Sequence, residues 1–207
     1  MKPVMIIGNG GHASVVTDVI KSLNNYYIKG YLDDVQKEYI RSDGLIYDAI
    51  AHIDRYKDNY FVIAIGVNQQ RAAVYHRLGL DDQYFATIIH PTAIIGSNVI
   101  IQAGCVVMAH AVIQTNTFIA KQCIINTKAC VEHDNNIQSF THIGPNATLA
   151  GNVHVGSECL LGASATVVPN TIIRNKVTVG AGSTVINDIQ SNLTVVGSPA
   201  RQRGDNK

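Results

Sequence analysis

The sequence of 207 residues predicts two domains of different fold class, a small α/β domain followed by an all-β solenoid. The composition changes near residue 85: all nine tyrosines lie between Tyr26 and Tyr84, and residues 1–85 hold 19 charged residues, whereas residues 86–187 hold seven. Apolar runs alternate with amphipathic stretches in the first half, and a period of six residues runs through the second. We therefore expect domains at 1–85 and 86–187, with a C-terminal tail at 188–207.

The first half has the pattern of a parallel sheet covered by helices. Short apolar runs that suit buried strands lie at 4–7, 28–32 and 60–65, and helical periodicity appears at 13–23 and 69–78. Strands that alternate with helices, with glycines at the junctions, are typical of α/β domains. A Rossmann-like N-terminal domain is therefore predicted.

The second half repeats every six residues from Ala86 onward. The fourth position is Ile, Val or Leu in all seventeen hexads, and the second is small or β-branched except for Asn135. A helix needs apolar residues at a spacing of about 3.6, and a hairpin array needs turns about every 8–12 residues, so neither explains this period. A three-sided parallel β-helix does, because three hexads form one 18-residue coil and the inward aliphatic residues stack at about 4.8 Å.

The 18-residue coil assigns residues to faces. Cys105, Cys123 and Cys159 share one inward column, so we interpret them as packing residues rather than redox groups. Another column, just beyond a corner, holds only Asn and Asp, as expected for stacked turn residues. Its members are Asn98, Asn116, Asp134, Asn152, Asn170 and Asp188.

Composition excludes several classes of protein. The net charge is +1 without a Lys/Arg block, which argues against nucleic-acid or anionic-membrane partners. The N-terminus lacks an apolar signal region, and no run approaches the ~20 apolar residues that cross a bilayer, so a cytoplasmic protein is expected. Four cysteines without a CxxC pair favour neither a disulfide framework nor a zinc ribbon.

A glycine-rich turn follows the first predicted strand. Gly8–Ala13 satisfies G-x-G-x-x-G/A, and Asp33 follows Ala13 by twenty residues, as in dinucleotide-binding domains. The motif alone favours NAD, but about 85 residues supply little more than one of the two mononucleotide-binding halves. A nucleoside diphosphate fits better, with its phosphates on the turn and its ribose or base on Asp33 and Asp34. The alternative is a turn that serves only the strand-to-helix geometry.

His133 is the main candidate for chemistry among the eight histidines. It stands in Val-Glu-His-Asp at a predicted corner, and Gly151 has the same position one coil later. Here it can accept a proton from an amine or hydroxyl, while a neighbouring carboxylate holds its tautomer and a glycine N–H meets a developing oxyanion. Spacing alone equally allows a solvent-facing corner histidine beside an aspartate.

The sequence resembles the family of sialic-acid O-acetyltransferases and nucleotide-4-aminosugar N-acetyltransferases, which are hexapeptide-repeat acyltransferases with a left-handed parallel β-helix. The similar motifs cover both domains in chain order. They are Gly8–His12, Leu32–Asp34, Ile63–Gly66, Val131–Asp134, His142, Leu149–Val153 and Gly197–Ala200. Some proteins with this repeat are carbonic anhydrases with three zinc-binding histidines, but Ser97 and Gln138 preclude such a triad around His133, and no metal is expected.

The resemblance implies roles for individual residues. His133 would be the general base, and Asp134, a member of the Asn/Asp column, would raise its basicity. Acetyl-CoA would lie along His142, Gly151, Ala163 and Ala181. The nucleotide sugar would bind at Gly10, Gly11, His12, Asp33, Asp34 and Gly66.

The same resemblance implies a homotrimer. By the 18-residue period, His142 lies half a coil from His133, on the side opposite its corner. One solenoid therefore cannot bring both side chains to one substrate, whereas two neighbouring chains can. The acceptor and the thioester are expected to meet in a groove between solenoids.

We expect the protein to move acetyl from acetyl-CoA to the 4-amino group of a UDP- or dTDP-linked 4-amino-4,6-dideoxysugar for surface glycan synthesis. The amine would attack directly, and the Gly151 N–H would stabilise the oxyanion. One alternative is an O-acetyltransferase for a sialic-acid-type sugar, and the other is a non-catalytic nucleotide-sugar-binding scaffold. The sequence leaves open the nucleotide base and the stereochemistry at the sugar C4.

Overall fold

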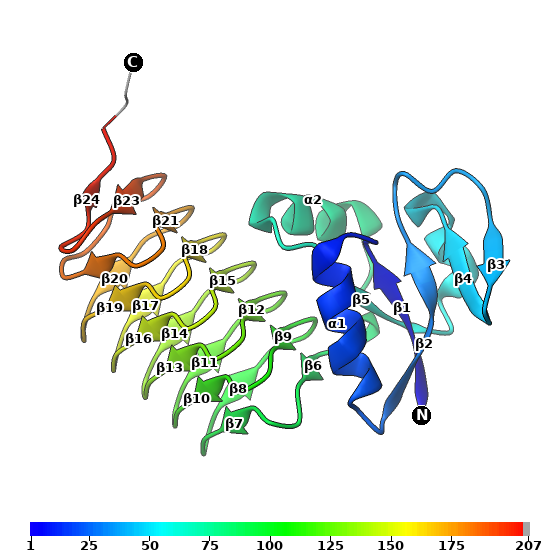
Figure 1. Cartoon of the computed structure of the whole chain (residues 1–207), viewed down its shortest axis with the longest axis horizontal. Helices are drawn as coiled ribbons and strands as arrows, with labels where there is room; N and C mark the ends of the chain where they lie inside the picture. Colours follow the sequence, from blue (N-terminus) through cyan, green and yellow to red (C-terminus); the bar gives the residue numbers. More distant parts are fainter. Residues whose placement is uncertain (205–207) are drawn as a thin grey trace.

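The computed structural model describes residues 1–204. An α/β domain forms one end of the molecule, and a stack of short strands runs from it toward the C-terminus (Figure 1). Strand pairing within this stack is parallel from β6 through β23. The predicted fold class, an α/β domain followed by a parallel β-helix, is confirmed. In the described part of the chain, no helix is long and apolar enough to cross a membrane.

The N-terminal sheet has the strand order β3-β4-β2-β1-β5. Its central strands are apolar because helices cover both faces, and residues 4–7 of β1 are completely buried. The elements are β1 (Lys2–Ile7), α1 (Gly11–Lys21), β2 (Tyr26–Leu32), β3 (Ile40–Ser42), β4 (Leu45–Asp48), η1 (Ile50–Tyr56), β5 (Tyr60–Ile63), α2 (Asn68–Leu78) and η2 (Asp82–Tyr84).

The solenoid has one two-residue strand at the third and fourth positions of each hexad. Strands 18 residues apart pair in parallel, as Val112 does with Cys130, so three sheets form the three faces. The strands are β6 (Ile88–Ile89), β7 (Ile94–Ile95), β8 (Ile100–Ile101), β9 (Val106–Val107), β10 (Val112–Ile113), β11 (Phe118–Ile119), β12 (Ile124–Ile125), β13 (Cys130–Val131), β14 (Asn136–Ile137), β15 (His142–Ile143), β16 (Thr148–Leu149), β17 (His154–Val155), β18 (Leu160–Leu161), β19 (Thr166–Val167), β20 (Ile172–Ile173), β21 (Thr178–Val179) and β22 (Thr184–Val185).

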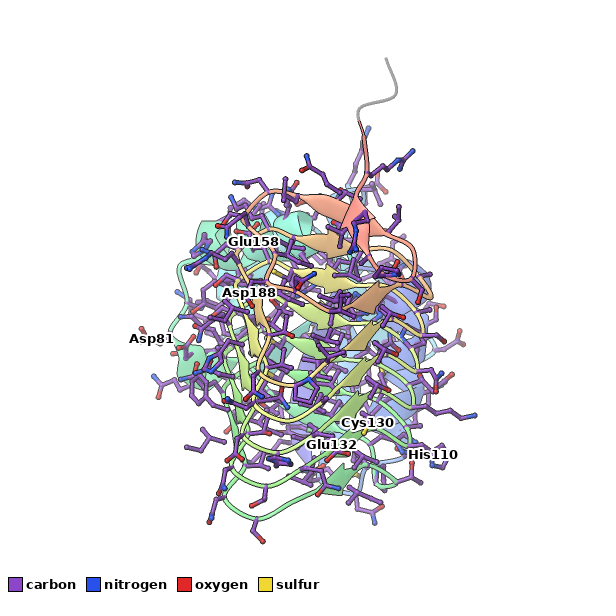
Figure 2. All side chains as sticks on the ribbon, turned by 90° about the vertical axis from the view of Figure 1, so that its left-hand side faces the viewer. Asp81, His110, Cys130, Glu132, Glu158 and Asp188 are labelled. Atoms are coloured by element: carbon purple, nitrogen blue, oxygen red, sulfur yellow. The ribbon has the colours of Figure 1, made fainter. Side chains whose placement is uncertain are left out.

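The corners of the solenoid use left-handed backbone. His110, Asp134 and Glu158 stand just beyond the three corners and have φ of 58–59°; Figure 2 shows His110 and Glu158 on different sides of the rod. Asn and Asp tolerate this conformation better than most residues, but the other two corners hold other residue types at the same φ. Hydrogen bonds between successive Asn and Asp side chains therefore distinguish the column from the other two corners. Side chains of the column form a hydrogen-bonded ladder in two runs. Asn98 Nδ2 donates to Asn116 Oδ1 and Asn116 Nδ2 to Asp134 Oδ1, each at 3.1 Å, and Asn152 Nδ2 donates to Asn170 Oδ1 at 2.8 Å.

The segment 188–204, part of the expected tail, contains two further strands. β23 (Thr194–Val196) pairs in parallel with β21, and β24 (Arg201–Gln202) pairs antiparallel with β23. The solenoid therefore extends beyond the expected boundary at residue 187. Val195 pairs with Val179, sixteen residues earlier rather than eighteen, so the six-residue pattern does not reach this strand.

The two domains share apolar packing. Ile88, Val106 and Met108 on the outside of the solenoid belong to one cluster with Val16 and Ile20 of α1. Phe140, at a solenoid corner, packs with Tyr75 of α2 and with Phe85. This contact places the carboxyl edge of the N-terminal sheet beside the largest sheet of the solenoid, which contains β15.

Candidate active site

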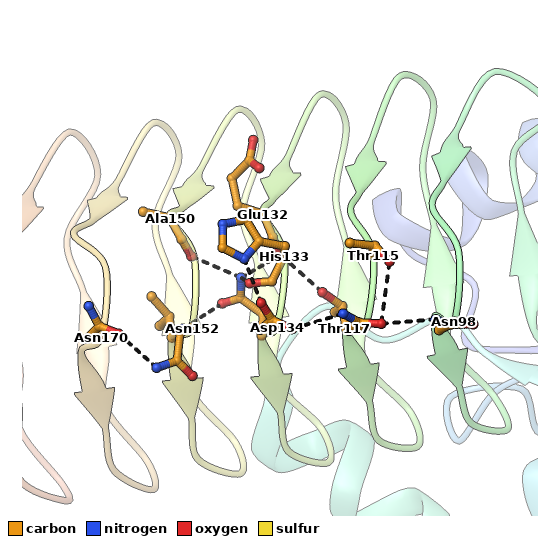
Figure 3. Close-up of polar contacts among 12 residues, drawn as sticks. Asn98, Thr115, Thr117, Glu132, His133, Asp134, Ala150, Asn152 and Asn170 are labelled. Atoms are coloured by element: carbon orange, nitrogen blue, oxygen red, sulfur yellow. Dashed lines mark hydrogen bonds and ion pairs between the residues drawn. The ribbon is translucent and has the colours of Figure 1, made fainter.

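His133 lies in the turn between β13 and β14, where two sheets of the solenoid meet (Figure 3). Its Nδ1 is 2.7 Å from Asp134 Oδ2, and its side chain is 56% exposed. An ionised carboxylate can only accept, so Nδ1–H donates and Nε2 keeps its lone pair. The hydrogen bond with His133 is the largest cause that lowers the pKa of Asp134, followed by that with Asn116. The exposed imidazole is therefore prepared to act as a base at Nε2.

Asp134 serves both as orienting carboxylate and as ladder residue. While Oδ2 accepts from His133, Oδ1 accepts from Asn116 Nδ2 at 3.1 Å. The two functions use different oxygens of one carboxylate, so they are compatible. The ladder in turn fixes the direction of the carboxylate against the ring.

Gly151 lies directly beneath the imidazole. A Cβ on this glycine would be 2.6 Å from both Cε1 and Nε2 of His133, so the ring occupies the space of a side chain. The backbones are also tied, since Asn152 N donates to the His133 carbonyl at 2.9 Å. Within residues 1–204 the N–H of Gly151 has no hydrogen-bond partner. The arrangement puts a free backbone donor next to the basic nitrogen.

A cavity of about 400 Å³ opens at the carboxyl ends of β1, β2 and β5. This is the edge at which ligands bind in parallel α/β sheets. The residues predicted for the nucleotide sugar all line it: Gly10, Gly11, His12, Asp33, Asp34 and Gly66. A Cβ on Gly10 or Gly11 would meet no described atom within 4 Å, so the N-terminus of α1 is open to an anion.

The two carboxylates of this cavity have partners within the domain. Asp33 Oδ2 accepts from Asn9 N at 2.8 Å, which holds the glycine-rich turn against β2. Asp34 Oδ2 accepts from Arg77 Nη2 of α2 at 2.7 Å. Both retain acceptor capacity for the hydroxyl or amide groups of a nucleotide.

His12 and His142 come together where the domains meet. Their ring centroids are 6.5 Å apart, and His142 Nε2 is 2.9 Å from Asn126 Nδ2. Burial, and secondly the charge of Arg71, lowers the pKa of each imidazole from 6.5 to about 4. Both are therefore neutral at neutral pH. His12 lines the cavity of the N-terminal domain and His142 lies on β15, so the two rings meet where the cavity borders the solenoid.

The four residues predicted along acetyl-CoA lie in three places on one chain. His142 is on β15 beside the N-terminal domain, and Gly151 is at the corner of His133. Ala163 and Ala181 are exposed at a third place, the corner that follows β18 and β21. Gly162, next to Ala163, has no room for a side chain, because its Cβ would be 2.5 Å from Ala181 N. This corner is consequently smooth and suited to an extended ligand.

Comparison with known proteins identifies the family. Residues 3–78 match the model of the PglD N-terminal domain, and residues 152–186 match that of the hexapeptide repeat of succinyl-transferase. The acetyltransferase domain of PglB from Neisseria gonorrhoeae FA1090 is 32% identical, with a TM-score of 0.87 over 98% of this chain and 100% of that one. The chain belongs to the nucleotide-aminosugar N-acetyltransferase family. The resemblance noted from the motifs is thereby confirmed.

Two further members of this nucleotide-aminosugar N-acetyltransferase family have informative names. A mutant of perosamine N-acetyltransferase from Caulobacter crescentus, in complex with CoA and GDP-perosamine, is 30% identical, with a TM-score of 0.89 over 99% of this chain and 98% of that one. UDP-N-acetylbacillosamine N-acetyltransferase from Bacillus subtilis is 40% identical over 113 residues, 53% of this chain. The match spans about half the length of that curated relative, 52%.

Sequence reasoning missed Asn126, the partner of His142. Asn126 directly follows β12 and His142 begins β15, adjacent strands of the same sheet, so the 18-residue period could have shown that they are neighbours. Sequence reasoning also did not anticipate Arg71 and Asn68, which hold α2 to the solenoid through carbonyls of solenoid residues. No group of three or more His, Cys, Asp or Glu that could hold a metal occurs among the described residues.

The histidine pair gives this family member a predictable response to acid. Folded His12 and His142 remain neutral down to about pH 4, whereas the unfolded chain protonates them below 6.5. The unfolded state therefore binds more protons in this window, and the free energy of unfolding should fall as pH decreases from 6.5 to 4. Urea unfolding at several pH values measures this. His142→Asn should reduce the dependence, and His154→Asn, at an exposed position, should not; equal slopes for the two variants would contradict the prediction.

Proposed function

We propose that the protein transfers acetyl from acetyl-CoA to the 4-amino group of a nucleotide-linked 4-amino-4,6-dideoxysugar. The observation that supports this most directly is the His133 imidazole, held by Asp134 through Nδ1 and placed with Nε2 over Gly151. A base beside a free backbone N–H suits acyl transfer to an amine. The open N-terminus of α1 suits the diphosphate of the acceptor.

In the proposed reaction His133 Nε2 takes a proton from the amine as its nitrogen attacks the thioester carbon. The C–N bond forms, and the carbonyl oxygen becomes an oxyanion next to the Gly151 N–H. When the intermediate collapses, the C–S bond breaks and the imidazolium returns its proton to the CoA thiolate. No covalent enzyme intermediate is needed. Cys105, Cys123 and Cys159 are buried, and Cys130 is half-buried with its Sγ 3.6 Å from Glu132 Oε1.

We further propose that the site forms between chains of a homotrimer. His133 lies where the sheets containing β13 and β14 meet, whereas His142 and the nucleotide cavity lie against the third sheet. A neighbouring solenoid would supply the missing half of the site. The proposed division assigns nucleotide-sugar binding to residues 1–85 and acetyl transfer to the solenoid that starts at residue 86, in a cytoplasmic enzyme of surface glycan synthesis.

The test is release of CoA from acetyl-CoA with a panel of UDP-, dTDP- and GDP-linked 4-amino sugars and their 4-hydroxy analogues. We expect release with at least one amine and not with its hydroxyl analogue. Release with hydroxyl acceptors alone would favour the O-acetyltransferase. Binding of a nucleotide sugar without release for any acceptor would favour the scaffold.

A further inference from the structure

Side chains at the second hexad position point into the solenoid, and many of them tie consecutive coils together. The Sγ of Cys105 lies 3.1 Å from the carbonyl of Ala120, and the Oγ1 of Thr141 lies 2.7 Å from that of Gly156. Each of these donors contacts the carbonyl 15 residues later, just before the corner of the next coil. This bond is the regular tie of the repeat, and a hydroxyl can add a second bond, since Thr141 Oγ1 also accepts from Cys159 N at 3.1 Å.

Asn135 is the exception in this position. It is the only amide among the seventeen second-position residues, and it is 1% exposed. Its Nδ2 makes the regular tie to the Ala150 carbonyl at 2.9 Å and also contacts the Glu132 carbonyl at 2.6 Å. The carbonyl of His133 lies 3.3 Å from the same nitrogen, and Oδ1 accepts from Val153 N at 3.2 Å. Both amide protons and the amide oxygen are therefore used.

The hydrogen-bond partners of Asn135 belong to the two corners that carry His133 and Gly151. The Glu132 and His133 carbonyls belong to the corner of the base, and Figure 3 shows both residues near Ala150 of the next coil. Ala150 and Val153 flank the corner of Gly151. The buried amide thus joins the backbone of the proton acceptor to that of the oxyanion donor. A Thr at the same position would provide the bond to the Ala150 carbonyl and, as Thr141 does for Cys159 N, an acceptor for Val153 N. It would provide no bond to the Glu132 or His133 carbonyl.

We propose that Asn135 is a positioning residue for acetyl transfer. It fixes the position of His133 Nε2 relative to the Gly151 N–H by holding both corners with one side chain. This inference rests on the proposed function, because it matters only if these two groups act on one reacting centre. A displacement of catalytic groups by about 1 Å can cost a factor of about 100 in rate, so loss of the amide bonds should appear in kcat.

Three variants test this. Asn135→Val removes all amide bonds, whereas Asn135→Thr keeps a hydroxyl for the Ala150 carbonyl and Val153 N but makes no bond to the Glu132 or His133 carbonyl. Thr171→Val is the matched control, since Thr171 occupies the same inward column two coils later and donates to the Val168 carbonyl at 2.8 Å. Asn135→Val should lower kcat about 10-fold or more while KM for acetyl-CoA changes less than about two-fold. Asn135→Thr should be intermediate, and Thr171→Val should keep kcat within about two-fold of wild type.

A double-variant cycle distinguishes positioning from general loss of stability. If Asn135 acts through His133, Asn135→Val should cause no further loss of single-turnover rate in the His133→Ala background. Equal loss in both backgrounds, or a loss no larger than that of Thr171→Val, would overturn the inference. If Asn135→Val does not fold, the same cycle with Asn135→Thr decides. Wild-type protein that releases no CoA with any acceptor would remove the proposed function itself, whereas an active wild type with a fully active Asn135→Val would remove only this inference.

Discussion

His133→Ala is expected to lower kcat by at least ~100-fold, because it removes the group that accepts the proton as the amine attacks. Acetyl-CoA binding should change little, since the ring is exposed at its corner and, within residues 1–204, hydrogen-bonds only through Nδ1, to Asp134. Initial rates of CoA release and calorimetric titration with CoA measure the two quantities separately.

The control for this variant is His154→Ala. His154 is an exposed histidine of β17, the strand that pairs with β14, and its pairing partner is Asn136. It has no assigned function in the reaction. Its replacement should leave kcat within about two-fold of wild type. Near-normal turnover in His133→Ala, or an equal loss in both variants, would remove His133 from the role of general base.

The solenoid and its corner could be predicted from sequence because they depend on one period. The 18-residue coil follows from inward aliphatic residues every six positions, and it places Gly151 beside His133 without coordinates. The same 18-residue period places His142 half a coil away from His133, on the opposite side of the solenoid. What it did not reveal is that Asp134 bonds the ring and the ladder at once, since this depends on the direction of a side chain.

Features outside that period were missed for physical reasons. The β3–β4 hairpin turns at Asp43 and Gly44, both with positive φ, and Asp-Gly is a known hairpin signal. All residues of β3 are exposed, however, so no apolar alternation marks the strand. β23 has a pairing offset of sixteen residues, which breaks the hexad count.

The approach of His12 to His142 was also beyond sequence reasoning. The 6.5 Å between their ring centroids depends on how the outer face of the solenoid packs against α1 and α2, and not on any internal period. The glycine-rich turn, in contrast, lies at the cavity because it follows a buried parallel strand. Local motifs were predictable, whereas contacts between the domains were not.

Arg71→Met is expected to lower the free energy of unfolding by at least ~3 kcal/mol, because it leaves several buried carbonyls without donors. Arg71 is 1% exposed and lies on α2. Its Nε donates to the Gln122 carbonyl at 2.8 Å and its Nη2 to the Phe140 carbonyl at 2.8 Å, so two coils of the solenoid depend on one side chain. Its Nη1 donates to the carbonyl of Ile65 at 2.9 Å, and Ile65 lines the nucleotide cavity.

The thermal midpoint of Arg71→Met should fall by roughly 6–12 °C for a chain of this size. Arg77→Met is the matched control on the same helix, because Arg77 forms an ion pair with Asp34 in which both side chains are more than half exposed. Such pairs contribute about 0–1 kcal/mol, so this variant should shift the midpoint by no more than about 4 °C.

Since Arg71 also holds the strand end at Ile65 against the solenoid, its loss should weaken nucleotide-sugar binding more than acetyl-CoA binding. Equal stability of the two variants would mean that apolar packing alone, through Phe140 and its neighbours, holds the domains together.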